Sequence, residues 1–115
     1  MNIEAMERNA GEAARLLKAM SNPNRLLVLC RLSQGERSVG ELGRELGLSQ
    51  SALSQHLARL RAEGLVTARR RSQSVFYALS SPDVRLLIDL LEARFCALPD
   101  NEEPPRPTPP PSRSS

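Results

Sequence analysis

The clearest chemical feature of this chain is a run of hydroxyl and amide side chains at the start of one expected helix. Leu53 and Leu57 mark the inner side of that helix, so Ser51, Ser54 and Gln55 point mostly outward at roughly 100° per residue. Serine and bidentate glutamine side chains can hydrogen-bond base edges or phosphates when the N-terminal end of a helix enters a major groove. We interpret the segment as a DNA-reading helix, the alternative being an ordinary solvated surface.

A basic hairpin follows this helix and offers cations for the same task. Arg69, Arg70 and Arg71 approach the tip of a hairpin expected over residues 66–79, and Gln73 lies at that tip. Cations there can reach phosphates or a minor groove, whereas a solvated charge cluster is the alternative. The residues that we expect to contact DNA are Ser49, Gln50, Ser51, Ser54, Gln55, His56, Arg59, Arg69, Arg70, Arg71 and Gln73.

Enzymatic and metal chemistry find little support in the residue types. His56 is expected at the margin of the apolar stripe formed by Leu53 and Leu57. As the only histidine it cannot form a metal site with histidine partners, and we expect it to pack or to hydrogen-bond a phosphate. No Cys-x-x-C motif is present, and a Cys/His catalytic pair would compete with the DNA-reading helix for its histidine. The sequence therefore predicts neither an enzyme nor a bound metal or cofactor.

Two cysteines, Cys30 and Cys96, are the other reactive side chains. Such a distant pair makes neither a zinc ribbon nor a disulfide framework. No apolar run approaches the ~20 residues needed to span a bilayer, so we expect a cytoplasmic protein without a membrane partner. In that reducing compartment both cysteines would be thiols, either reactive or simply buried in the structure. Cys96 shares a helical face with Asp89, Glu92 and Ala93, so we expect it at the margin of the core.

Residues 38–65 contain the signals of two short helices joined by a tight turn. Ser38 and Glu41 have the capping-box spacing, in which each side chain accepts a hydrogen bond from a free backbone N–H. Gly47 permits the positive φ at which helices end, and Ser49 can cap the next helix. A turn of this length is typical of the helix-turn-helix.

The flanking segments complete a winged helix-turn-helix. Apolar residues recur at helical spacing over residues 3–20, and Asn22 with Pro23 begins a second helix that stops at Gly35. Strands are expected at residues 66–71 and 74–79, before a last helix capped by Ser81. The fold is therefore mainly α with a two-stranded β wing (α+β), in the order helix, helix, helix, helix, strand, strand, helix. Inner positions are expected at Leu26, Leu27, Leu29, Cys30 and Leu32 of the second helix and at Val84, Leu87, Ile88, Leu91, Phe95 and Leu98 of the last.

Composition bounds the domain organisation. The 115 residues carry a net charge of +3, only three aromatics and 40% hydrophobic residues, so one core of Leu, Val and Ala is expected, completed by a partner subunit. Residues 59–71 are basic, whereas residues 82–103 are acidic. We expect one DNA-binding and dimerisation domain at residues 1–98, followed by a disordered proline-rich tail at residues 99–115.

Residues 12–98 resemble the ArsR/SmtB family of dimeric bacterial repressors. The matching motifs are AMSNPNRL at residues 19–26, LSQSALSQHLxxLRxxGLV at residues 48–66 and RRxxQxxFYxL at residues 69–79. The resemblance implies a homodimer joined by its first and last helices. It also implies binding to double-stranded operator DNA without inducer, and release when an inducer acts.

The positions of Cys30 and Cys96 resemble the thiol pair of the persulfide-sensing branch of this family, the SqrR/BigR type. In that branch, persulfides or polysulfides join the pair through several sulfur atoms and the repressor leaves DNA. Metal-sensing members carry cysteines in the first helix of the helix-turn-helix, or Asp and His in the last helix. This chain has no cysteine at residues 38–46 and no histidine at residues 82–98. A metal, a metalloid or a general oxidant remains the alternative inducer, and a protein-interaction adaptor using the proline-rich tail is the alternative function.

Overall fold

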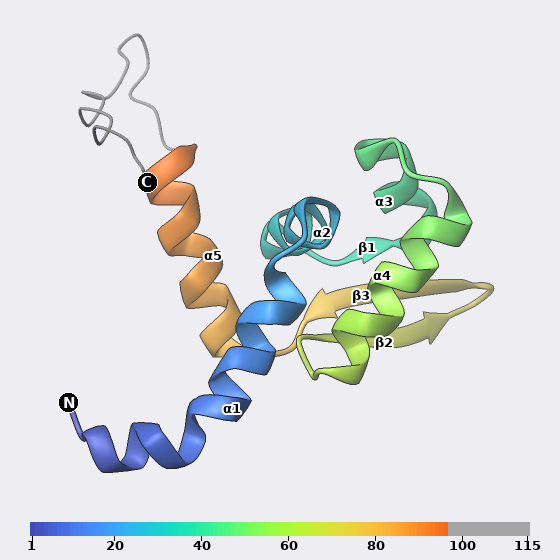
Figure 1. Ribbon diagram of the computed structural model, residues 1–115. Coiled ribbons are helices and arrows are strands. Elements are labelled where there is room, and N and C mark those ends of the chain that lie inside the picture. Colours follow the sequence, from blue (N-terminus) through green and yellow to red (C-terminus); the bar gives the residue numbers. More distant parts are fainter. Residues whose placement is uncertain (97–115) are drawn as a thin grey trace, which may run out of the picture.

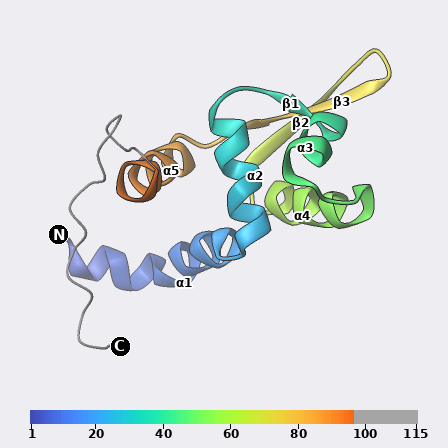
Figure 2. The same ribbon diagram turned by 90° about the horizontal axis from the view of Figure 1, so that it is seen from above.

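The computed structural model describes residues 1–96, and its elements follow the expected order of a winged helix-turn-helix (Figure 1). Leu98 and the proposed tail at residues 99–115 lie outside the described residues. In both views α2 lies between two groups of elements, with α1 and α5 on one side and α3, α4 and the strands on the other (Figures 1 and 2). The elements are α1 (Ile3–Met20), α2 (Pro23–Ser33), β1 (Arg37–Ser38), α3 (Val39–Leu46), α4 (Gln50–Ala62), β2 (Val66–Arg71), β3 (Ser74–Leu79) and α5 (Pro82–Phe95).

Local capping determines where the helices begin and end, and the predicted caps are confirmed. The Asn22 side chain accepts hydrogen bonds from two backbone N–H groups at the start of α2. Ser38 and Glu41 form both hydrogen bonds of the capping box that begins α3, at 3.1 and 2.8 Å. Gly47 ends α3 with φ of 68°, and Ser49 then caps α4. These local bonds place α3 and α4 as a helix-turn-helix.

The sheet has three antiparallel strands rather than the two that the sequence predicted. Its order is β1-β3-β2, with Arg37 opposite Tyr77 and Ser38 opposite Phe76. The hairpin of β2 and β3 is confirmed, with a turn in which Ser72 adopts φ of 58°. The added strand was missed because two residues are too short to show the alternation of a strand, and its partner lies far along the chain.

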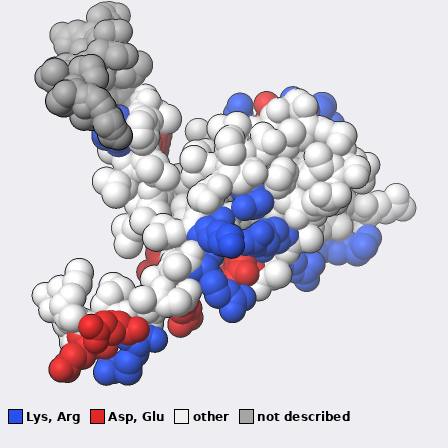
Figure 3. Space-filling model, in the orientation of Figure 1, with Lys and Arg blue, Asp and Glu red and all other residues white. Residues whose placement is uncertain are grey.

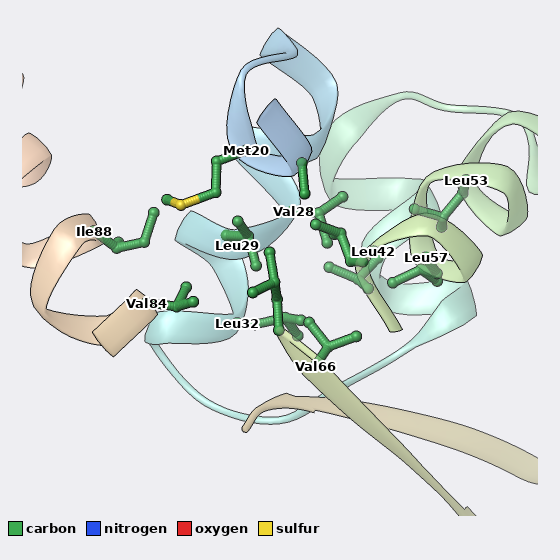
Figure 4. Close-up of a cluster of buried hydrophobic side chains, with 13 residues drawn as sticks. Met20, Val28, Leu29, Leu32, Leu42, Leu53, Leu57, Val66, Val84 and Ile88 are labelled. Atoms are coloured by element: carbon green, nitrogen blue, oxygen red, sulfur yellow. The ribbon is translucent and has the colours of Figure 1, made fainter. Parts of the chain in front are cut away.

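The core is built from aliphatic side chains of all the helices and of β2 (Figure 4). No polar or charged residue among the described ones is buried. One expectation for α2 is wrong: Leu27 is 48% exposed, and Val28 is buried instead. In α5 the expected inner residue Phe95 is 68% exposed. The buried residues are Ala19, Met20, Val28, Leu29, Leu32, Leu42, Leu53, Leu57, Leu60, Leu65, Val66, Val84 and Ile88.

Helices α1 and α5 keep a large apolar surface uncovered within the chain. In α1 only Ala19 and Met20 at its C-terminal end are buried, although the helix spans Ile3–Met20 as expected. Exposed apolar residues that gather on two helices are typical of protein interfaces. None of the helices among residues 1–96 is long and apolar enough to cross a membrane. The large exposed apolar residues of the helices are Ile3, Met6, Leu17, Leu27, Leu86, Leu90 and Phe95.

Candidate nucleic-acid interface and thiol pair

The outer face of α4 carries the polar side chains that the sequence placed there. Leu53 and Leu57 are buried on the inner side with no more than 1% exposure, which orients Ser51, Ser54 and Gln55 outward, where all three are exposed. The Ser49 hydroxyl accepts the backbone N–H of Ala52 at 3.1 Å, so it is engaged as a cap. The exposed hydroxyl and amide groups therefore gather at the first two turns of α4, the end of a helix that enters a major groove.

The other predicted contact residues of α4 lie on its flanks. Gln50 precedes the exposed group and is itself exposed. His56 and Arg59 are half-buried, one helical turn apart, so the sequence placed His56 correctly at the margin of the apolar stripe. Gln73 lies exposed in the turn between β2 and β3.

A shallow groove separates α4 from the wing and adds one residue that the sequence reasoning missed. Its walls are Ser54, Ala58, Arg61 and Ala62 of α4 and Tyr77 of β3. Arg61 is exposed and follows Ser54 by seven residues, a spacing that keeps both on one face of a helix. That periodicity was the available signal. The groove thus brings a hydroxyl, a cation and a phenol side by side between two elements proposed to touch DNA.

The three wing arginines differ in their surroundings. Arg69 donates through Nε and Nη2 to both carboxylate oxygens of Glu36, at 2.8 and 3.0 Å, and Arg71 Nη2 lies 3.5 Å from Glu36 Oε1. The hydrogen bond from Arg69 is the main reason why the pKa of Glu36 lies below its ordinary value. The Arg71 guanidinium also stacks over the Phe76 ring at 4.7 Å. Among residues 1–96 no carboxylate forms an ion pair with Arg70.

Positive charge gathers in two places on the face seen in Figure 3. One cluster covers the region where the C-terminal half of α1 meets the end of α4, and the other lies along the wing. In the first cluster Arg15 pairs with Glu63 at 3.3 Å, joining α1 to the end of α4. The surface over α5 is mostly uncharged in this view (Figure 3).

Both cysteines are free thiols, and they lie on two helices that contact each other, α2 and α5. Cys30 on α2 is half-buried, whereas Cys96 caps the C-terminus of α5 and is exposed rather than at the margin of the core. Burial raises the pKa of Cys30, and the charges of Cys96 and then Glu92 raise that pKa further. The two thiols thus lie in the C-terminal half of α2 and at the C-terminal end of α5, although the cysteines are far apart in sequence.

The side chains that could bind a metal ion do not form a cluster in the part of the chain that the structure describes. Within residues 1–96 no group of three or more His, Cys, Asp or Glu side chains is arranged to hold a metal ion.

Comparisons with known proteins agree with this geometry. A family model described as bacterial regulatory protein, arsR family, matches residues 22–68. The transcriptional activator HlyU of Vibrio cholerae is 55% identical over 84% of this chain and 89% of its own length. Its structure in a reduced form superposes with a TM-score of 0.79, covering 82% of this chain and 99% of that one.

Two further solved structures are similar. The transcriptional repressor BigR of Xylella fastidiosa is 44% identical, with a TM-score of 0.78 over 84% of this chain and 99% of that one. A homodimeric winged helix-turn-helix DNA-binding domain from Mycobacterium bovis is 32% identical, with a TM-score of 0.70 over 82% of this chain and 85% of that one.

Proposed function

The chain belongs to the arsR family of bacterial regulatory proteins, which are DNA-binding transcriptional regulators, and we propose that it is a dimeric repressor in which Cys30 and Cys96 sense reactive sulfur. One observation supports the sensing proposal: two free thiols lie on two helices that contact each other, Cys30 on α2 and Cys96 at the C-terminal cap of α5. Bridging of the pair by persulfides or polysulfides releases the operator DNA.

The DNA interface that we propose combines α4 with the wing. The exposed Ser51, Ser54 and Gln55 read base edges or phosphates, while Arg59 and the wing arginines neutralise phosphates. The groove between α4 and β3 supports this assignment because it is open and carries Ser54 and Arg61 on one wall.

The dimer seam that we propose is formed by α1 and α5. Exposed apolar side chains on both helices support this seam, because burying them against a second copy removes apolar surface from water and stabilises the dimer. They are Leu17, Leu86, Leu90 and Phe95. The relative from Mycobacterium bovis is described as homodimeric. Two copies would present two α4 helices to successive major grooves, about 34 Å apart.

The sensing reaction proceeds by thiol exchange with a low-molecular-weight polysulfide. The Cys30 thiolate attacks an inner sulfur of the polysulfide and displaces a small thiolate, so that Cys30 carries a short sulfur chain. The Cys96 thiolate then attacks that chain and displaces a second small thiolate. The cysteine pair is oxidised, the polysulfide is reduced, and the two cysteine protons end on the two released thiols.

Selectivity for sulfur follows if the pair is too far apart for a direct disulfide. A direct bond requires Cα atoms within about 7 Å, whereas each additional S–S bond of ~2 Å lets a longer gap close without distortion of the backbone. Hydrogen peroxide would then oxidise the cysteines separately to sulfenic acids.

Release of DNA follows from the position of the two cysteines, because a bridge between them would move the C-terminal end of α5. Val84 and Ile88 are buried, and Arg85 donates to the Ser33 carbonyl of α2 at 3.1 Å, so the N-terminal half of α5 is attached to the body. Cys96 at the other end is exposed. A bridge to Cys30 would draw that free end toward α2, displace the apolar seam and change the spacing of the two α4 helices. A differential stability of a few kcal/mol is enough for such a switch.

The test compares operator binding before and after treatment with glutathione trisulfide. We expect Cys30→Ser and Cys96→Ser to bind operator like the unaltered protein but to stay bound after treatment, in gel shifts with intact-mass measurement. Loss of the same two hydrogens with peroxide as with trisulfide would refute the selectivity, and release of DNA from both serine variants would refute the sensor.

The direction of regulation has a second candidate. The relative HlyU is named an activator, whereas BigR is named a repressor. A reporter gene behind the operator, with and without this protein, distinguishes the two roles: repression lowers the basal signal and activation raises it.

A further inference from the structure

Glu36 lies outside both the helix-turn-helix and the hairpin, yet it contacts two of the three wing arginines. Its two carboxylate oxygens accept both hydrogen bonds from Arg69, at 2.8 and 3.0 Å, and its Oε1 lies 3.5 Å from Arg71 Nη2. The side chain of Glu36 is 27% exposed, while those of Arg69 and Arg71 remain 60% and 57% exposed. One carboxylate thus joins two cations at the surface of the sheet.

The short strand β1 makes this contact possible. Glu36 immediately precedes β1, and β1 pairs with β3, the central strand of the sheet. Arg69 is 33 residues away from Glu36 in sequence. The pairing of β1 with β3 places Glu36 beside the hairpin that contains Arg69. The pairing therefore has a consequence for the charge of the wing.

Strand alternation places the third arginine on the other face. Side chains of successive strand residues point to opposite sides, so Arg69 and Arg71 share one face of β2 and Arg70 occupies the other. Ala68, on the same face as Arg70, pairs with Tyr77, which lines the groove beside α4. Arg70 thus lies on the groove side of the wing, and no carboxylate among residues 1–96 pairs with it.

We propose that Glu36 is a positioning residue that limits how many wing cations reach DNA phosphates. By clamping Arg69 and Arg71 on the face away from the groove, it leaves Arg70 as the principal phosphate contact of the wing. The inference rests on the proposed DNA contact of the wing. It adds that the strength of this contact is restrained by a carboxylate from a distant part of the chain.

The expected effect follows from counterion release. Each phosphate neutralised by a cation changes the slope of log K against log salt by about 0.9 on duplex DNA. Glu36→Gln frees roughly one net positive charge, so the slope should steepen by about 0.9 for both operator and unrelated DNA. Affinity should then fall by an additional factor of about 3.5 between 50 and 200 mM salt, with tighter nonspecific binding at the lower concentration.

Glu45→Gln is the matched control. Glu45 also pairs with two arginines, Arg31 at 3.8 Å and Arg37 at 3.3 Å, and neither belongs to the hairpin. Both variants remove one negative charge and release two guanidinium groups. Binding would be measured by fluorescence anisotropy over a range of salt concentrations, on operator and on unrelated duplex, after circular dichroism has verified the fold.

The proposal expects a steeper slope for Glu36→Gln alone, returned to the original slope by Arg69→Gln in the same chain. Equal slopes for Glu36→Gln and Glu45→Gln would overturn it. Arg70→Gln separates this outcome from failure of the proposed function: if Arg70→Gln also leaves the slope unchanged, the wing does not contact phosphates at all. Should Glu36→Gln not fold, Arg69→Gln in the original chain should reduce the slope by less than half as much as Arg70→Gln, and an equal reduction would overturn the clamp.

Discussion

Leu90 of α5 gives a direct test of the proposed dimer seam. This leucine is 63% exposed in the single chain, and its neighbour one turn earlier, Leu86, is 67% exposed. Complete burial of a leucine side chain stabilises by about 1.5–3 kcal/mol, so covering the exposed part of Leu90 contributes roughly 1–2 kcal/mol. In a two-fold symmetric dimer each residue occurs twice. Leu90→Ala should therefore weaken the dimer by roughly 2–4 kcal/mol.

Such a loss is large enough to measure. At about 1.4 kcal/mol for each factor of ten, the dimer dissociation constant should rise by about 30-fold to several hundred-fold. Sedimentation velocity over a range of protein concentrations measures it. The fold of each subunit should survive, because Leu90 contributes to a surface rather than to the core of the chain, and circular dichroism checks this.

The control is Val75→Ala in β3, a half-buried apolar residue of the wing, on the opposite side of the molecule from α5 (Figure 1). Equal dissociation constants for Leu90→Ala and Val75→Ala would refute the reasoning that α5 forms the seam. The DNA assay should follow the assembly state. A subunit with one α4 helix binds one half-site, so operator affinity of Leu90→Ala should recover at high protein concentration.

Four other substitutions test the core, the thiol and the DNA interface. Leu29→Ala removes a side chain with no exposure and should lower the free energy of unfolding in urea by about 2–5 kcal/mol. Glu92→Gln removes a charge that raises the pKa of Cys30, so alkylation of Cys30 by iodoacetamide at fixed pH should be faster and its pH midpoint lower. Arg70→Ala should weaken operator and unrelated DNA alike and reduce the salt slope by about 0.9. Gln55→Ala should weaken operator binding by about 1–3 kcal/mol more than nonspecific binding in gel shifts.

Each of these expectations has an outcome that contradicts it. A stability change below 1 kcal/mol for Leu29→Ala would mean that the core relaxes to fill the space. An alkylation rate unaffected by Glu92→Gln would separate that carboxylate from Cys30. Equal losses on operator and unrelated DNA for Gln55→Ala would make it a phosphate contact, and a loss confined to the operator for Arg70→Ala would make that arginine a base contact.

The features that the sequence predicted well are local ones. The capping box of Ser38 and Glu41, the glycine turn at Gly47 and the caps Asn22 and Ser81 all involve residues within three or four positions of one another. Their hydrogen bonds form within one segment whatever the rest of the chain does. The element order and the inner face of α4 followed from the same short-range periodicity.

The features that the sequence did not predict depend on contacts between distant segments. Periodicity shows that a helix has an apolar side, but it does not show whether another element of the same chain will cover that side. This is why Leu27 and Phe95, both expected to be inner residues, are exposed. Cys96 is exposed for the same reason, since the last turn of α5 before it is exposed as well.

Positive charge illustrates the same limit at the functional site. Counting arginines along residues 59–71 predicted a basic wing with the three cations Arg69, Arg70 and Arg71. In the fold, two of them share the Glu36 carboxylate, which the sequence places before the helix-turn-helix and nowhere near the hairpin. An ion pair joins Arg15 to Glu63, 48 residues away in sequence, in the same manner. The number of cations that the wing can offer to DNA phosphates therefore depends on the strand pairing and on the ion pairs that this pairing creates. The net charge of a segment overstates that number wherever a carboxylate from a distant segment lies beside its cations.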